Sequence, residues 1–216
     1  MNPRAWVALT CLITLACGAF GFARARAVRG SRPVPVGEAE PETHKVTPDM
    51  LASAEARAKN PAPTFRLADA QGTTRDLGEM LATGPVVLVF IKDGCPCSVG
   101  AQSYFNALHA LYGGRLRLLG IVDGDANLAR RWTSANHVPF PMLPDPDLTT
   151  TRGYGATNSA FVALVGRDGR IDALWPGYSA DMLRDLNRRA AAQAGLPELS
   201  IDTSDAPDDL YSGCPY

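Results

Sequence analysis

The chain has 216 residues, of which 46% are hydrophobic and 20% are charged. This composition is typical of a soluble globular protein with one well-packed domain and appendages. The formal net charge is −1, and no dense basic run is present that could neutralise a series of phosphates. Composition and charge therefore argue against a nucleic-acid partner.

The amino-terminal residues 1–27 have the pattern of an export signal. Arg4 precedes an apolar stretch over residues 5–22, and the alternating alanines at 23–27 offer cleavage sites with small residues. The apolar stretch is also just long enough to span a bilayer, so an uncleaved anchor is the alternative. In either case the sequence predicts an extracytoplasmic chain, which is periplasmic, secreted or membrane-anchored through residues 5–22.

Export changes both the charge and the cysteine content of the chain. Without residues 1–27, 18 basic and 22 acidic side chains remain, together with Cys95, Cys97 and Cys214. Three cysteines cannot all pair within one chain, and exported proteins reside in an oxidising compartment. We therefore expect one thiol to be free, or the three thiols to exchange partners.

Two segments flank the predicted domain. Four prolines within residues 28–48 prevent a periodic apolar face, and a Thr-Pro-Asp helix start follows at residue 47. Residues 28–60 are therefore predicted to be a Pro-rich tether and a short helix. Residues 196–216 hold five acids and no lysine or arginine, which predicts a flexible acidic tail carrying Cys214.

Residues 61–195 alternate between strand and helix patterns. Apolar alternation and apolar runs predict strands at 64–67, 86–91, 116–122, 160–165 and 171–174, and helical periodicity predicts helices at 98–112, 125–135 and 180–194. The continuous β-branched run at 86–91 suits a central strand that is covered on both faces. The order of these elements predicts one α/β domain with a mixed β-sheet sandwiched by helices.

The motif Cys95-Pro96-Cys97 falls between the predicted central strand and the helix that follows it. Unpaired backbone amides and the helix dipole favour an anion at that place, and a cysteine there has a lowered pKa. A disulfide across one residue would close a small, strained and easily reduced ring. The position therefore favours a redox pair over a static disulfide or two packed thiols.

Neither a metal nor an organic cofactor is expected from the sequence. The histidines are His44, His109 and His137, and no second Cys or His pair stands at the spacing of a zinc site. Thiol chemistry at the Cys-Pro-Cys motif requires no organic cofactor. The site residues are therefore expected to be cysteines alone.

The sequence resembles the redoxin branch of the thioredoxin-like superfamily, which includes AhpC/TSA relatives. The resemblance covers about residues 61–190 and rests on the segments 62–65, 69–72, 85–91, 95–98, 154–157 and 161–169. It implies a thioredoxin-like fold and identifies Cys95 with the attacking cysteine of that family. Cys97 lies one residue short of the second cysteine in the usual Cys-x-x-Cys spacing.

Two residues depart from the pattern of that family. Asn158 follows Thr157, where the family commonly has a cis-proline facing the cysteines. This departure keeps open a non-catalytic binding module. Lys92 stands three residues before Cys95, where peroxidases carry a threonine or serine that orients peroxide. This second departure argues against a typical peroxiredoxin.

The leading hypothesis is an extracytoplasmic thiol-disulfide oxidoreductase that acts on protein thiols or disulfides and exchanges electrons with a thiol reductant system. Cys95 attacks, and Cys97 or Cys214 resolves the mixed disulfide. A thiol peroxidase, in which Cys95 passes through a sulfenic acid, is the alternative enzyme. Cys214 has its own alternatives, since a lone tail cysteine can also be an incidental exposed thiol or a link between chains.

Overall fold

The computed structural model describes residues 44–216. The predicted export signal or anchor at residues 1–27 and the Pro-rich part of the tether up to residue 43 lie outside the described residues. Within residues 44–216, none of the helices combines the length and the apolarity that a membrane span needs.

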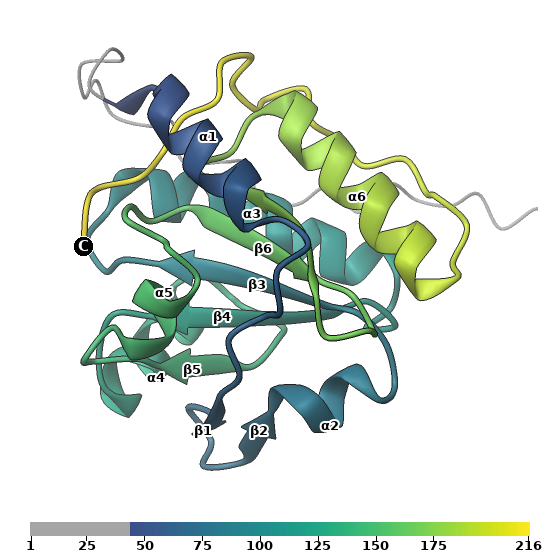
Figure 1. Ribbon diagram of the computed structural model, residues 1–216. Coiled ribbons are helices and arrows are strands. Elements are labelled where there is room, and N and C mark those ends of the chain that lie inside the picture. The colour runs from purple at the N-terminus through teal and green to yellow at the C-terminus, as the bar shows by residue number, and fades with distance from the viewer. Residues whose placement is uncertain (1–43) are drawn as a thin grey trace, which may run out of the picture.

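A mixed five-stranded sheet with the strand order β5-β4-β3-β6-β7 forms the centre of the domain (Figure 1). Its strands are β3 (Val86–Ile91), β4 (Arg117–Val122), β5 (Met142–Pro144), β6 (Phe161–Val165) and β7 (Ile171–Trp175). β3 pairs in parallel with β4, as β4 does with β5, whereas β6 is antiparallel to both β3 and β7. The predicted mixed sheet with a covered central strand is thus observed.

The helices begin where the sequence supplies capping side chains. They are α1 (Pro48–Arg57), α2 (Leu77–Leu81), α3 (Pro96–Leu111), α4 (Ala126–Ala135), α5 (Thr149–Gly153) and α6 (Ala180–Ala194). Thr47, Asp125 and Ser179 each accept a hydrogen bond from a backbone amide in the first turn of the helix that follows. Gly195 ends α6 in the left-handed conformation.

The residues of β3 alternate between two apolar layers. Val87, Val89 and Ile91 belong to the layer under α3, α4 and α6, while Val86, Leu88 and Phe90 belong to the layer under α1 and α2. Because both faces are covered, all six residues of β3 are buried. The rigid centre of the sheet therefore fixes the position of the chain that leaves β3 at Ile91.

Four short elements were absent from the prediction: β2 (Thr74–Asp76), which pairs with β1 (Arg66–Ala68), and also α2, β5 and α5. Each has five residues or fewer and depends on contacts from distant parts of the chain. The α5 turn, for example, is held by the buried Asp145 carboxylate, which accepts hydrogen bonds from the backbone of Thr150 and from Thr151. Such contacts leave no periodic pattern within the element itself.

The carboxy-terminal segment 196–216 corrects one expectation, because it packs against the domain instead of forming a flexible tail. Its apolar residues Leu196, Leu199, Ile201, Ala206, Leu210 and Cys214 contact the core cluster. Tyr178 and Tyr211 exchange two backbone hydrogen bonds of 2.9 and 3.0 Å. The many acids of this segment suggested a polar tail, although its spaced apolar residues hold it along α6. The yellow trace in Figure 1 shows this path.

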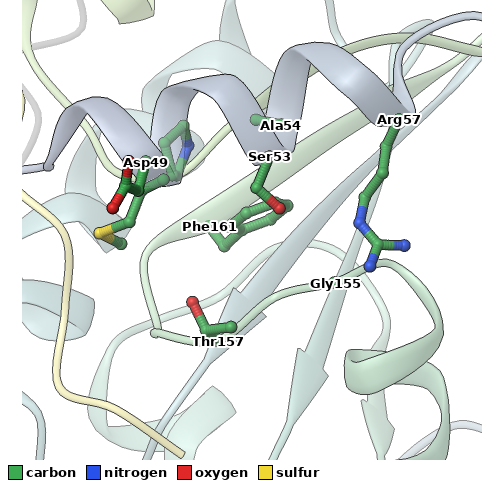
Figure 2. A pocket seen from close by; sticks show the side chains of 9 residues that line it. Asp49, Ser53, Ala54, Arg57, Gly155, Thr157 and Phe161 are labelled. Carbon is green, nitrogen blue, oxygen red and sulfur yellow. The ribbon is translucent and has the colours of Figure 1, made fainter.

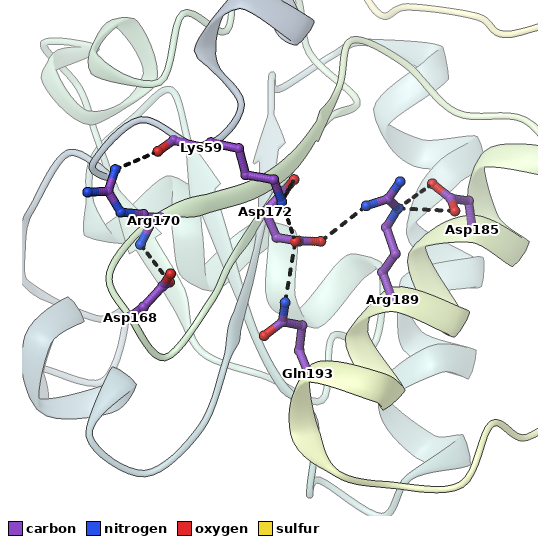
Figure 3. A network of polar contacts seen from close by, with 7 residues as sticks. All are labelled: Lys59, Asp168, Arg170, Asp172, Asp185, Arg189 and Gln193. Atoms are coloured by element: carbon purple, nitrogen blue, oxygen red, sulfur yellow. Dashed lines mark hydrogen bonds and ion pairs between the residues drawn. The ribbon is translucent and has the colours of Figure 1, made fainter.

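A polar network ties β7 to its neighbours on both sides (Figure 3). The Asp172 carboxylate accepts hydrogen bonds from Lys59 Nζ at 2.8 Å, from Arg189 Nη1 at 3.3 Å and from Gln193 Nε2 at 3.3 Å. Arg189 also binds Asp185 one turn earlier on α6. The network joins the end of α1 to α6 across β7 and lies away from the cysteines.

Candidate thiol active site

Cys95 lies where β3 leads into α3. A tight turn after Ile91 brings the chain to Cys95, and Gly94 supplies the positive φ of 72° that this turn requires. Cys95 is the N-cap residue of α3, and Pro96 is its first helical residue. The predicted strand-to-helix placement of the motif is therefore observed, and Cys95 lies at the positive end of a 16-residue helix.

The sulfur of Cys95 is surrounded by hydrogen-bond donors from separate segments. The Ser159 hydroxyl and the backbone N–H of Cys214 each donate to Cys95 Sγ at 3.1 Å. Cys95 is only 1% exposed and Ser159 is fully buried. Buried donors of this kind stabilise the charged form of their acceptor, because no water competes for it.

Hydrogen bonds from several groups lower the pKa of Cys95 to about 3. The hydrogen bond from the Cys97 thiol is the largest cause, and the amide of Cys214, the hydroxyl of Ser159 and the amide of Ser98 lower it further. Burial acts in the opposite direction but is outweighed. Cys95 is therefore a thiolate at neutral pH, the form in which a cysteine is nucleophilic.

The other two cysteines have the opposite character. The hydrogen bond to Cys95, burial and the negative charge of Cys95 together raise the pKa of Cys97. Burial is the largest cause that raises the pKa of Cys214, followed by its interaction with Cys95. All three cysteines are free thiols in this structure. The site thus holds one thiolate and two protonated thiols that interact with it.

Ser159 is the site residue that the sequence analysis missed. β6 runs antiparallel to β3 with Phe161 opposite Phe90, so the residues just before β6 lie beside those just after β3. This register carries Ser159 to Cys95. The signal was available only through strand pairing, since a single serine before an apolar run carries no motif of its own.

The last residues of the chain run antiparallel to the loop 157–159. Ser159 donates its backbone N–H to the Cys214 carbonyl at 3.0 Å and accepts from Gly213 N–H at 2.8 Å. Tyr216 N–H donates to the Thr157 carbonyl at 3.1 Å. The structure therefore brings Cys214 close to Cys95, as a resolving role for Cys214 requires. The contact is made by an ordered segment and not by a mobile tail.

Asn158 and Lys92, the two residues that depart from the family pattern, both contact this carboxy-terminal segment. The side chain of Asn158 donates to the Gly213 carbonyl at 3.0 Å, and no cis peptide bond occurs within residues 44–216. Lys92 Nζ donates to the Pro215 carbonyl at 2.5 Å. Both residues therefore hold the end of the chain over the site.

The cavity drawn in Figure 2 lies apart from the cysteines. Its volume is about 190 Å³, and it is lined by Asp49, Met50, Ser53, Ala54, Arg57, Gly155, Thr157, Phe161 and Pro176. It is smaller than most small-molecule sites, which hold roughly 300–1,000 Å³. Among residues 44–216, no group of three or more His, Cys, Asp or Glu side chains could hold a metal ion.

Solved structures with a similar fold include several thiol enzymes. A candidate thiol:disulfide interchange protein DsbE from Chlorobium tepidum has a TM-score of 0.57 and 21% identity, over 64% of this chain and 98% of that chain. A secreted Mycobacterium tuberculosis disulfide oxidoreductase homologous to Escherichia coli DsbE has a TM-score of 0.51 and 22% identity, over 59% and 95%. The peroxidoxin BcpB from the same organism has a TM-score of 0.50 and 19% identity, over 64% and 96%.

These likenesses show that the fold is thioredoxin-like, in agreement with the expected fold class. No curated protein matches the sequence. The family model described as AhpC/TSA matches residues 58–174, which include β3, Cys95, Cys97 and all of the hairpin formed by β6 and β7 except Trp175. The expected resemblance is thus confirmed, and the chain belongs to the AhpC/TSA family.

Proposed function

We propose that the protein is an extracytoplasmic thiol-disulfide oxidoreductase in which Cys95 is the attacking thiol. The observation that carries this proposal is the set of donors around Cys95 Sγ, which keeps a thiolate at the start of α3. The neighbours described as a DsbE protein and as a secreted disulfide oxidoreductase support the activity. The export pattern of residues 1–27 supports the location.

The reaction needs only the three thiols and a partner disulfide. The Cys95 thiolate attacks one sulfur of the disulfide, a new S–S bond forms, and the other partner sulfur leaves as a thiolate that takes up a proton. Cys97 or Cys214 then loses its proton and attacks Cys95 Sγ, which releases the partner as a dithiol and leaves an internal disulfide. A thiol reductant system restores the reduced form by the reverse exchange.

Both candidate resolving thiols interact with Cys95, but they differ in geometry. Cys97 lies within the first turn of α3, so a Cys95–Cys97 bond would close the small ring discussed above. Cys214 comes from another segment and already places its backbone N–H 3.1 Å from Cys95 Sγ. The strain of a ring closed across one residue therefore favours Cys214 as the resolving thiol.

The test is reduction of a protein disulfide by the purified chain and by three single variants, Cys95→Ser, Cys97→Ser and Cys214→Ser. We expect Cys95→Ser to abolish the activity and Cys214→Ser to accumulate mixed disulfides with the substrate. Peptide mapping under non-reducing conditions identifies the resolving thiol. Full activity of Cys95→Ser would reject the proposal.

A thiol peroxidase is the second candidate, and one observation favours it. The hydroxyl that peroxidases carry three residues before the cysteine is replaced by Lys92, but Ser159 places a hydroxyl 3.1 Å from Cys95 Sγ from another element. The neighbour described as a peroxidoxin shares the fold. Fast, saturable consumption of peroxide that is lost in Cys95→Ser would establish this activity, whereas we expect disulfide reduction to be faster.

A further inference from the structure

We propose that residues 213–216 form an internal cover that competes with partner proteins for Cys95, and that the Cys95 thiolate itself holds this cover closed. The inference rests on the proposed function, because it concerns how partners reach the attacking thiol. The reduced site is then masked, and the cover is released once Cys95 carries a mixed disulfide with a partner or another group from outside the chain, whereas an internal disulfide with Cys214 would fix the cover in place.

The cover occupies the surface that a partner must reach. Gly213, Cys214 and Tyr216 pair with the backbone of Thr157 and Ser159 through three hydrogen bonds of 2.8–3.1 Å. Beneath this strand Cys95 is only 1% exposed. A disulfide carried by another protein therefore cannot meet Cys95 Sγ in line while the cover is in place.

The cover is held by polar contacts at both ends. Asn158 binds the Gly213 carbonyl, and Lys92 Nζ binds the Pro215 carbonyl. Between them, the Cys214 N–H donates to Cys95 Sγ. Hydrogen bonds to a charged acceptor are roughly twice as strong as those between neutral groups. The sulfur of a mixed disulfide is neutral, so a bond from Cys95 to a partner weakens the central contact of the cover while leaving the outer two unchanged.

Gly213 gives a way to open the cover without substituting any thiol or Ser159. A Cβ atom at residue 213 would lie 2.0 Å from Ser159 Oγ and 2.8 Å from the Ser159 carbonyl group. The carbon and oxygen of the Ser159 carbonyl group cannot move without displacing the backbone of the loop 157–159. Gly213→Ala therefore forces residues 213–216 away from this loop. Glu198→Gln is the matched control, because it changes an exposed residue of the same segment that lies outside the cover.

The first experiment measures the rate at which Cys95 of the full chain forms a mixed disulfide with a disulfide-containing protein. Mass spectrometry of the Cys95 peptide over time is the readout. Cys214→Ser is the reference, so that resolution by Cys214, the favoured resolving thiol, does not interfere. We expect Gly213→Ala in this background to raise the rate by about fivefold to tenfold, the effect of losing one net hydrogen bond. Glu198→Gln should leave it unchanged.

The two proposals fail in different ways. If Cys214→Ser does not react with disulfides at all, the proposed function is wrong. If it reacts and Gly213→Ala does not increase the rate, the cover is wrong. A second measurement guards against misfolding of Gly213→Ala: hydrogen exchange of the amides at residues 213, 214 and 216 in Cys214→Ser, before and after Cys95 is capped by methyl methanethiosulfonate. We expect faster exchange after capping, and unchanged exchange would overturn the inference.

Discussion

At the residue scale, the chemistry of the site depends on how one sulfur is solvated. Cys95 has lost contact with water but has gained hydrogen bonds from Cys97, Cys214, Ser159 and the helix start. Exchange of water for fixed donors stabilises the thiolate, because the donors need no reorganisation when charge resides on the sulfur. The distribution of protons, with one thiolate and two thiols, follows from this arrangement.

Ser159→Ala should raise the pKa of Cys95 by about one to two units, because a hydrogen bond to a charged group contributes about 1.5–3 kcal/mol. The ultraviolet absorbance of the thiolate, followed as a function of pH, measures this shift. Ser53→Ala on the exposed face of α1 is the matched control and should leave the titration unchanged. An unchanged midpoint in Ser159→Ala would show that its hydroxyl does not stabilise the thiolate.

The sequence predicted part of this site but not all of it. Cys95 was found because a cysteine at a strand-to-helix junction has a physical reason to be reactive. Ser159 was missed because its role depends on the antiparallel register of β3 and β6, which local sequence does not reveal. Lys92 was noted as a departure, but its contact with Pro215 depends on a segment 123 residues away.

At the element scale, the long helices and buried strands were predicted because their apolar periodicity is local. The packing of the carboxy-terminal segment was not predicted, because it depends on individual side chains that belong to other elements. Tyr112 at the end of α3 donates to Asn187 Oδ1 at 2.8 Å and accepts from Leu199 N–H at 3.2 Å, and Asn187 Nδ2 binds the Leu199 carbonyl. This buried network fastens the segment to α3 and α6.

Tyr112→Phe should lower the free energy of unfolding by about 1–3 kcal/mol, because it leaves buried polar groups of Asn187 and Leu199 without a partner. Tyr104→Phe is the matched control on the same helix, since the Tyr104 hydroxyl is buried and has no hydrogen-bond partner among residues 44–216. Its removal should be neutral or stabilising. Denaturant unfolding of both variants tests the difference, and equal destabilisation would contradict the role assigned to Tyr112.

At the scale of the whole molecule, the pKa of Cys95 links the redox site to stability. Its folded value of about 3 lies below that of an unfolded cysteine, so the native state binds fewer protons at neutral pH. The resulting stability is fully present above the unfolded pKa and is lost as the pH falls toward the folded pKa. Reduced protein should therefore become less stable as the pH falls, beyond the effect of its carboxylates.

The difference in unfolding free energy between wild type and Cys95→Ser isolates this contribution. As the pH falls from about 8 to 5, the unfolding free energy of the wild type relative to Cys95→Ser should decrease by up to about 1.4 kcal/mol per pH unit, which is the slope for one proton. Urea unfolding of the reduced proteins at several pH values provides the measurement. Parallel pH profiles of the two proteins would mean that Cys95 has the same pKa folded and unfolded.

The most direct test of the central claim is the ultraviolet thiolate absorbance of the fully reduced protein near pH 5, compared with that of Cys95→Ser. A free cysteine has a pKa of about 8.5 and carries almost no negative charge there. The donors around Cys95 predict one thiolate at this pH in the wild type and none in Cys95→Ser. Absence of thiolate in the wild type, or its persistence in Cys95→Ser, would contradict Cys95 as the attacking group.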